Sequence, residues 1–151
     1  MSAESSPMKL REGDSWLPAD EYGRSLKQGL GVNLLVKNVS KAVAFQTKVL
    51  EAETVYADPD FAVMRAGGTQ WMLHADHTYR DHEMAGVIDG VDVRGQGAEL
   101  RLYGRDPDAA EAAAREGGWT VLAGSLDKPH GQRETHIVDD DGYIWVPGIP
   151  I

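Results

Sequence analysis

Cysteine is absent from the 151-residue sequence. This excludes disulfide bonds, thiolate metal sites and thiol nucleophiles. Long hydrophobic runs are absent too. No stretch approaches the roughly 18 apolar residues of a membrane span, and residues 1–16 lack the apolar segment of a secretory signal. We therefore expect a soluble, cytoplasmic protein that has no membrane partner.

Basic residues are scarce relative to acidic ones. The chain has 15 Lys and Arg against 24 Asp and Glu, which gives a formal net charge of −9. This balance argues against nucleic acid or anionic lipid as a partner and favours a neutral or cationic small-molecule ligand. A chain of this length can bury roughly 70% of its unfolded surface in one core without disulfides or metals.

Motifs of nucleotide and serine chemistry are also missing. GGTQ at 67–70 and GQG at 95–97 are isolated turn glycines, and neither a phosphate-binding loop nor a nucleophile elbow is present. The sequence therefore offers no support for nucleotide binding or serine catalysis.

The predicted secondary structure repeats once. A short apolar run predicts a strand at 30–36, and apolar residues at helical spacing predict a helix at 38–50. Three strands separated by turn residues follow, at 53–58, 61–66 and 70–76. The second half has the same order of strand, helix and three strands, at 97–104, 106–118, 119–124, 133–140 and 142–148.

Spacing between corresponding residues supports an internal repeat. Gly31 and Gly97 are 66 residues apart, and Trp71 and Trp145 are 74 apart, because the second half contains a longer loop. A repeat of this kind indicates two similar structural units. We expect an irregular N-terminal arm lying on the body of the protein (1–29), a first βαβββ module (30–76), a polar connector (77–96) and a second βαβββ module (97–151).

Two stretches of the repeat have a distinctive pattern, NLLVKNVSKAVAFQTKVL at 33–50 and VDDDGYIWVPG at 138–148. Together with the repeated βαβββ order, they resemble the vicinal oxygen chelate superfamily of glyoxalases, extradiol dioxygenases, and bleomycin and fosfomycin resistance proteins. The resemblance covers about residues 30–148. It implies an α+β fold in which two βαβββ modules form an open, cup-shaped mixed β-sheet with helices outside. It also implies a homodimer, and C2 symmetry is the commonest form of oligomer.

Metal-using members of the superfamily carry four ligands, His or Gln and Glu, at four strand positions. The resemblance places two of these positions on Gly31 and Gly97, at the start of each module's first strand. The other two fall on Met72 and Val146, after the Trp of each last strand. Because side chains alternate along a strand, Trp71 and Trp145 are expected to point the other way, toward the helices. None offers the imidazole nitrogen or carboxylate oxygen that divalent cations prefer. We therefore expect no metal and no other cofactor at this place.

Residues two positions from these sites share their face of the sheet, because strand side chains alternate. The candidate ligand-binding residues are Asn33, Leu35, Met72, His74, Glu99, Arg101 and Val146. Glu99 and Arg101 form either a structural ion pair at the edge of the cleft or a contact to the ligand. His74 is either a hydrogen-bonding residue at the rim or a ligand contact that titrates near neutral pH.

The sequence favours a protein that binds a small molecule in the cup without metal at the usual site. The alternative is a glyoxalase-like or dioxygenase-like enzyme, with metal ligands relocated to His74, Glu99 and Asn33 or with metal-free acid–base chemistry of the pair His74 and Glu99. A second metal site is conceivable in the connector, at His77, Asp81 and His82. His130 lies in a loop where ligand specificity can be set, and the alternative is that it is simply an exposed loop residue. A purely structural or partner-binding domain is the third hypothesis.

Overall fold

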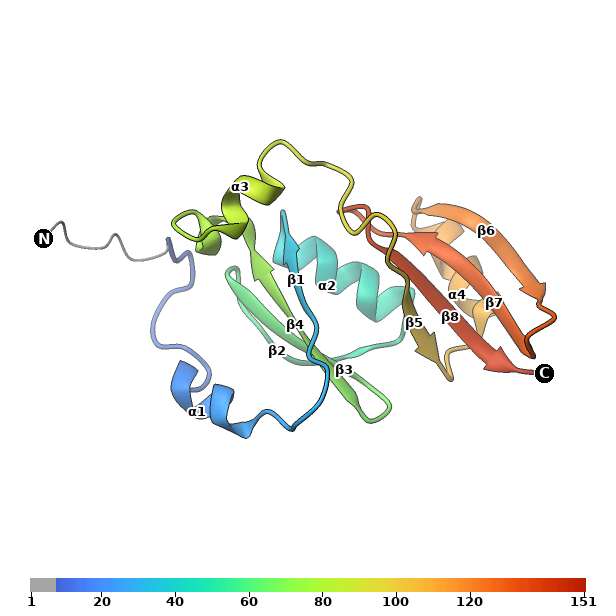
Figure 1. The fold of residues 1–151 in the computed structure, drawn as a ribbon, viewed down its shortest axis with the longest axis horizontal. Coiled ribbons are helices and arrows are strands. Elements are labelled where there is room, and N and C mark those ends of the chain that lie inside the picture. The colour runs from blue at the N-terminus through green and yellow to red at the C-terminus, as the bar shows by residue number, and fades with distance from the viewer. Residues whose placement is uncertain (1–7) are drawn as a thin grey trace, which may run out of the picture.

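The computed structural model describes residues 8–151, so that residues 1–7 of the expected arm lie outside the described part (Figure 1). The strand, helix and three-strand order occurs twice, as the sequence predicts. The elements are α1 (Ala19–Ser25), β1 (Asn33–Val36), α2 (Val39–Lys48), β2 (Glu53–Ala57), β3 (Phe61–Ala66), β4 (Thr69–Ala75), the 3-10 helix η1 (Asp76–Tyr79), α3 (Met84–Ile88), β5 (Leu100–Tyr103), α4 (Pro107–Glu116), β6 (Thr120–Asp127), β7 (Gln132–Val138) and β8 (Ile144–Pro150).

Each half of the chain forms its own four-stranded mixed sheet. The strand order is β1-β4-β3-β2 in the first sheet and β5-β8-β7-β6 in the second. In both sheets the first strand is parallel to the last, and the other pairs are antiparallel. The matching topology confirms the α+β fold of two βαβββ modules in an open cup. We call them the first module (β1, α2 and β2–β4) and the second module (β5, α4 and β6–β8).

The pairing register of the first strands differs from the expectation. Asn33 and Arg101 stand beside the residue that follows the Trp in each last strand. Gly31 and Gly97, which were expected at the start of the first strands, precede β1 and β5 and are exposed. Gly97 has a φ of 86°, a left-handed conformation that suits a turn and not a strand. The register is set by the long-range hydrogen-bonded ladder, which the spacing of turn glycines does not reveal.

Helices α2 and α4 begin at capped N-termini. The side chain of Asn38 accepts a hydrogen bond from the N–H of Lys41 at the start of α2. Asp106 does the same for Asp108 in α4, where Pro107 occupies the first turn. The caps fix where each helix starts and therefore which face meets its sheet. Within residues 8–151, no helix is both long enough and apolar enough to span a bilayer.

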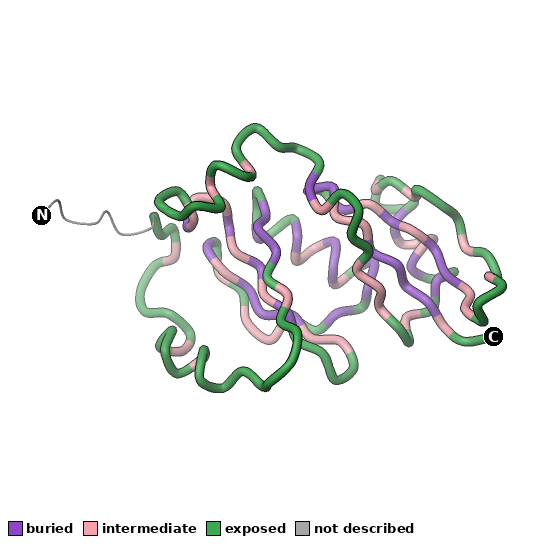
Figure 2. The backbone as a smooth tube through the Cα atoms, in the orientation of Figure 1, coloured by how far each residue is buried: buried purple, intermediate pink, exposed green. Residues whose placement is uncertain are grey.

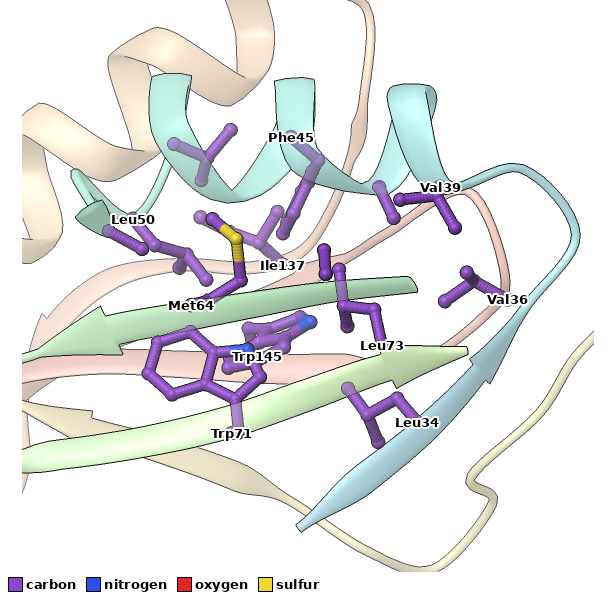
Figure 3. Close-up of a cluster of buried hydrophobic side chains, with 14 of the residues drawn as sticks. Leu34, Val36, Val39, Phe45, Leu50, Met64, Trp71, Leu73, Ile137 and Trp145 are labelled. Carbon is purple, nitrogen blue, oxygen red and sulfur yellow. The ribbon is translucent and has the colours of Figure 1, made fainter. Parts of the chain in front are cut away.

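The hydrophobic core lies between the helices and one face of each sheet (Figure 3). Phe45 of α2 is fully buried, and its ring meets that of Trp119 edge-on with centroids 5.3 Å apart. Trp71 and Trp145, from the last strands of the two modules, have ring centroids 5.6 Å apart. The indole N–H of Trp71 also donates to Gln46 at 2.9 Å. Both tryptophans point toward the helices, as predicted, which leaves the opposite face of each sheet for other contacts.

The polar connector contains η1 and α3 and is anchored by a buried arginine. Arg94 is 6% exposed and donates to the carbonyl of Leu35 on β1 at 3.0 Å. It also donates to both carboxylate oxygens of Asp76 at 2.7 Å. Its own N–H donates to the carbonyl of Asp141 at 2.8 Å. The connector therefore ties β1 and η1 to the turn before β8.

The N-terminal arm, residues 8–29, is exposed along most of its length (Figure 2). The expectation of an irregular segment is wrong for residues 19–25, which form α1, although no residue of this helix is buried. The arm is fastened at Asp60, whose carboxylate accepts hydrogen bonds from the N–H groups of Leu10 and Arg11 at 2.6 and 3.0 Å. It therefore lies on the body of the protein, as expected, but buries little of itself.

Candidate functional site

The inner face of each sheet, defined as the face turned away from α2 and α4, carries the predicted site residues. They are Asn33, Leu35, Met72 and His74 in the first module, and Glu99, Arg101 and Val146 in the second. Their strand neighbours Leu34, Leu73 and Trp145 point the other way, into the core. The register places these residues on the inner faces, whereas a role in ligand binding stays a prediction.

Asn33 and His74 form a polar pair on the first inner face. His74 Nδ1 lies 2.6 Å from Asn33 Oδ1, and Asn33 Nδ2 donates to the Tyr79 hydroxyl at 2.9 Å. Burial lowers the pKa of His74 to about 4, and the positive charge of Lys9 adds to the effect. The imidazole is therefore neutral at pH 7 and donates from Nδ1, which leaves Nε2 as an acceptor. The idea that His74 titrates near neutral pH is wrong.

A network of charged side chains spans the second inner face. Arg101 on β5 donates to Glu99 at 3.0 Å and also to Glu134 on β7. Glu99 lies in turn 2.6 Å from His136 Nε2, also on β7. Because β8 lies between β5 and β7, these contacts cross over Val146, which is 1% exposed. The Glu99–Arg101 pair that the sequence suggested is present, as part of a larger network.

The network keeps its carboxylates ionised. The hydrogen bond from His136 holds the pKa of Glu99 below its usual range, and Arg101 acts in the same direction. Burial alone would raise the pKa of Glu134, but the contacts with His130 and Arg101 outweigh it and lower this pKa. Two carboxylates therefore face one guanidinium on this inner face, an excess of negative charge whenever the imidazoles are neutral.

The residues present do not fit a divalent cation at the four strand positions of the metal-using proteins. With the observed register these positions carry Asn33, Met72, Arg101 and Val146. The guanidinium of Arg101 already supplies positive charge between Glu99 and Glu134, and it would repel a second cation there. Within residues 8–151, no three His, Cys, Asp or Glu side chains are grouped so that they could hold a metal ion. The expected lack of a cofactor at this place stays a prediction.

The displaced metal site proposed around His74 is not assembled. His74 contacts Asn33 in the first module, whereas Glu99 contacts His136 in the second. In the described part of the chain, no hydrogen bond or ion pair joins these two groups. His74 lies in β4 of the first sheet, whereas Glu99 directly precedes β5 of the second sheet.

The remaining histidines do not converge either. His77 lies 2.7 Å from Asp60, and His82 lies beside Tyr79 with ring centroids 4.8 Å apart. The conceivable metal site in the connector therefore has no common centre. His130 was expected to be an exposed loop residue; its side chain is 53% exposed and lies 3.2 Å from Glu134.

Sequence reasoning missed Glu134 and His136. Both lie in β7, on the face opposite Ile137, which belongs to the core. A signal was available, because two ionisable residues spaced two apart in an interior strand require partners on the same face. Tyr79 was missed for a different reason, since the turn of η1, which local patterns do not predict, places it beside Asn33 of β1.

A hollow of about 370 Å³ lies between the modules, bordered by the segment before β1, the turn between β3 and β4, and strand β5. Val32, Leu100 and Trp145 line it together with Glu99 and Arg101. Its volume falls in the range of pockets for small organic molecules, and its lining combines apolar walls with a few polar groups. The charged network of the second module therefore borders a cavity of suitable size.

A buried carboxylate organises the D-x-D-G turn before β8. Asp139 accepts hydrogen bonds from the indole N–H of Trp145 at 2.9 Å and from the N–H groups of Asp141 and Tyr143 at 2.9 and 3.0 Å. Burial raises its pKa to about 6, although these hydrogen bonds oppose the rise. The turn that supports the family resemblance therefore contains a group that titrates in mildly acidic solution.

We expect Asp139 and His74 to give stability–pH slopes of opposite sign. A carboxyl group whose pKa rises on folding from about 4 to about 6 stabilises the fold below pH 4, and the contribution is lost as the pH rises through 6. For an imidazole whose pKa falls from 6.5 to about 4, the contribution is present above pH 6.5 and lost as the pH falls through 4. Each slope is at most about 1.4 kcal/mol per pH unit.

Urea unfolding of two variants between pH 4 and 7 measures these slopes separately. Relative to the wild type, His74→Gln should make stability fall more steeply with rising pH, because the contribution of Asp139 is then unopposed. Asp139→Asn should do the reverse. The same change of slope in both variants would contradict the assignment.

The fold matches many solved structures. A glyoxalase/bleomycin resistance protein/dioxygenase family enzyme from Burkholderia phytofirmans PsJN superposes with a TM-score of 0.63 at 14% identity, over 80% of this chain and 96% of that one. A member of the same superfamily from Sphaerobacter thermophilus is 26% identical, with a TM-score of 0.58 over 82% of this chain and 98% of that one. A third, from Nocardioides, has a TM-score of 0.59 at 18% identity, over 87% of this chain and 92% of that one.

Sequence comparison gives no such matches. No protein-family model matches the chain, and no curated protein matches it by sequence. The structural similarities confirm the expected resemblance at the level of the fold, which is that of the glyoxalase/bleomycin resistance/dioxygenase proteins. Function must then be argued from the residues of the inner faces, because one fold carries many activities.

Proposed function

We propose that the protein binds a small organic molecule in its cup, without a divalent metal at the usual place. The observation that carries the proposal is the arrangement of Arg101, which bridges Glu99 and Glu134 on the second inner face. The guanidinium of Arg101 is a permanent positive charge that partly neutralises the two carboxylates, as a bound metal ion would. The hollow beside this network supplies space for the ligand.

The charge of the network favours a neutral or cationic ligand. Glu99 has 44% of its side chain exposed, so it is accessible from solvent while it contacts Arg101 and His136. An anionic ligand would have to compete with two carboxylates for the single guanidinium. A hydrogen-bond donor or an ammonium group on the ligand is the better match for Glu99.

A second candidate function is metal-free acid–base catalysis. It is favoured by the 2.6 Å contact between Glu99 and His136, an imidazole–carboxylate pair of the kind that general bases use. This replaces the pairing of Glu99 with His74 considered from the sequence. A proton-transfer reaction in a substrate bound at the hollow would then depend on His136.

Two further parts of the proposal concern the assembled protein. We infer a homodimer and a cytoplasmic location, in line with the sequence expectations. Light scattering coupled to size exclusion measures the mass of the particle, and cell fractionation the compartment. A monomer at micromolar concentration, or recovery with membranes, would contradict the respective part.

A thermal-shift screen of neutral and cationic small molecules tests the binding function. A ligand at about 100 times its dissociation constant adds about 2.7 kcal/mol to the free energy of unfolding. We expect Glu99→Gln to weaken binding of the best ligand at least about tenfold, or about 1.4 kcal/mol. The matched control is Glu116→Gln at the exposed end of α4, which should bind like the wild type.

Elemental analysis of the purified protein completes this test. Stoichiometric zinc, nickel, manganese or iron that is lost in Glu99→Gln would overturn the metal-free proposal. Equal ligand affinity in the Glu99 and Glu116 variants would remove the second inner face as the binding site. Turnover of a ligand that disappears in His136→Gln would favour the enzyme instead.

A further inference from the structure

The first inner face carries a row of aromatic rings. Tyr56 and Phe61 have ring centroids 6.3 Å apart, Phe61 and His74 4.8 Å, and His74 and Tyr79 5.4 Å. The rings come from β2, β3, β4 and η1, so the row crosses the sheet from one side to the other. Such a surface attracts flat aromatic molecules through stacking and edge contacts.

The N-terminal arm fills one end of this row with its own aromatic side chains. Trp16 stacks on Tyr56 with ring centroids 5.2 Å apart and an interplanar angle of 9°. Tyr22 of α1 meets Phe61 edge-on at 5.8 Å. Trp16 and Tyr22 also contact each other, at 5.8 Å. The arm therefore makes the contacts with this end of the row that a planar ligand would make.

The other end of the row is polar and open. Asn33 is exposed, and the amide connects His74 with the hydroxyl of Tyr79. Since the imidazole of His74 is neutral and donates from Nδ1, its Nε2 can accept a hydrogen bond. The row thus offers apolar stacking at one end and hydrogen bonding at the other.

The arm is attached more weakly than the strands it covers. Trp16 remains 38% exposed, and α1 contains no buried residue. The second inner face shows that the fold does not need such a cover. There the corresponding sheet leaves Tyr103 and Leu126 exposed, at 67% and 57%. The arm is therefore an addition to the module that can leave its place without exposing the core beneath the helices.

We propose that the aromatic row of the first inner face is a binding site for a planar aromatic molecule with a hydrogen-bonding group, and that Trp16 and Tyr22 compete with this ligand. The inference rests on the proposed binding function. It adds a second ligand-binding subsite, to which the arm regulates access. Ligand enters when the arm moves away from Tyr56 and Phe61. The apparent affinity is then reduced by the fraction of molecules in which the arm is closed.

Titration with indole, which is the side-chain ring of tryptophan, tests the competition. Isothermal titration calorimetry of the full chain compares the wild type with Trp16→Ala. If the arm is closed in about nine molecules of ten, removing Trp16 should tighten indole binding about tenfold. The matched control is Leu26→Ala, which truncates another exposed apolar side chain of the arm, located just after α1. This variant should bind indole like the wild type.

A double variant tests whether the increase in indole affinity arises at the aromatic row. Trp16→Ala combined with Tyr56→Ala should lose the added affinity, because Tyr56 provides the stacking surface. Shifts of the backbone amide signals of Tyr56 and His74 on indole addition identify the site directly, and circular dichroism verifies that each variant is folded. Unchanged affinity in Trp16→Ala, or an equal gain in the double variant, would overturn the proposal.

The two proposals can fail separately. A library compound that binds the wild type, together with no effect of Trp16→Ala on indole, would overturn the competing arm and leave the binding function of the second face standing. Tight indole binding by Trp16→Ala when no compound binds the wild type would support the site under the arm and count against the proposed function of the intact chain.

Discussion

Replacement of Arg94 by alanine is expected to lower the free energy of unfolding by about 3–5 kcal/mol, the usual cost of removing one partner of a buried ion pair. The guanidinium is among the most buried charges of the molecule, at 6% exposure. It makes a two-pronged contact with Asp76, with both distances at 2.7 Å. If Arg94 is removed, the Asp76 carboxylate stays partly buried and loses the positive charge that neutralises it.

The effect of Arg94 extends across the boundary between the modules. The carbonyl of Leu35 on β1 accepts hydrogen bonds both from Arg94 and from the hydroxyl of Tyr143 in the second module. The side chain of Asp141, from the same turn as Tyr143, accepts from the N–H of Lys37 just after β1. These contacts close the edge of β1 at one end. Loss of Arg94 should therefore weaken the contacts between β1 and the second module, as well as lower the free energy of unfolding.

Chemical denaturation compares Arg94→Ala with Arg94→Lys and Arg24→Ala. Lysine keeps the charge but lacks the planar fork that reaches both oxygens of Asp76, so an intermediate loss is expected. Arg24 forms an exposed ion pair with Asp20 within α1, and its removal should cost less than about 1 kcal/mol. If Arg94→Ala and Arg24→Ala lose equal amounts of unfolding free energy, the buried contacts of Arg94 stabilise the protein no more than an exposed ion pair does.

The repeated module could be predicted because its signals are local. Turn residues divide the strands, helical spacing marks α2 and α4, and alternation along a strand assigns each side chain to a face. Trp71 and Trp145 were placed toward the helices on this basis. Glu99 and Arg101 were placed on one face in the same way, because they are two residues apart in the strand predicted at 97–104.

The register of the sheets and the covering of the inner faces could not be predicted from local patterns. Asn33 stands beside Met72 because of a ladder between strands distant in sequence. Arg94 lies in a polar segment with no period, so nothing in the sequence distinguishes it from an exposed arginine. Trp16 reaches Tyr56 through an arm whose path depends on the attachment to Asp60. All these features depend on tertiary contacts.

Asp60→Ala is expected to release the arm and to cost about 3 kcal/mol, since hydrogen bonds to a charged acceptor contribute about 1.5–3 kcal/mol each. The carboxylate is fully buried and accepts the N–H groups of Leu10 and Arg11. It also contacts His77 at 2.7 Å. Burial alone would raise the pKa of Asp60, but the hydrogen bonds from His77, Arg11 and Leu10 outweigh it and lower this pKa.

Hydrogen exchange measured by mass spectrometry distinguishes release of the arm from a purely local loss. The N–H groups of Leu10 and Arg11 must exchange faster in Asp60→Ala, because their acceptor is gone. The informative amide is that of Tyr22, which donates to the carbonyl of Pro18 at 3.0 Å within α1 and makes no contact with Asp60. If the arm leaves as a unit, this helix loses the packing of Trp16 and Tyr22 against the sheet, and its exchange accelerates as well.

Asp20→Ala provides the comparison, since this carboxylate lies in α1 and forms an exposed ion pair with Arg24. It should leave the attachment at Leu10 and Arg11 intact. Accelerated exchange confined to residues 10 and 11 in Asp60→Ala would mean that the aromatic contacts alone keep the arm closed. In that case Asp60→Ala should also leave indole affinity unchanged, whereas an arm released as a unit uncovers Tyr56 and Phe61 and raises that affinity as Trp16→Ala does.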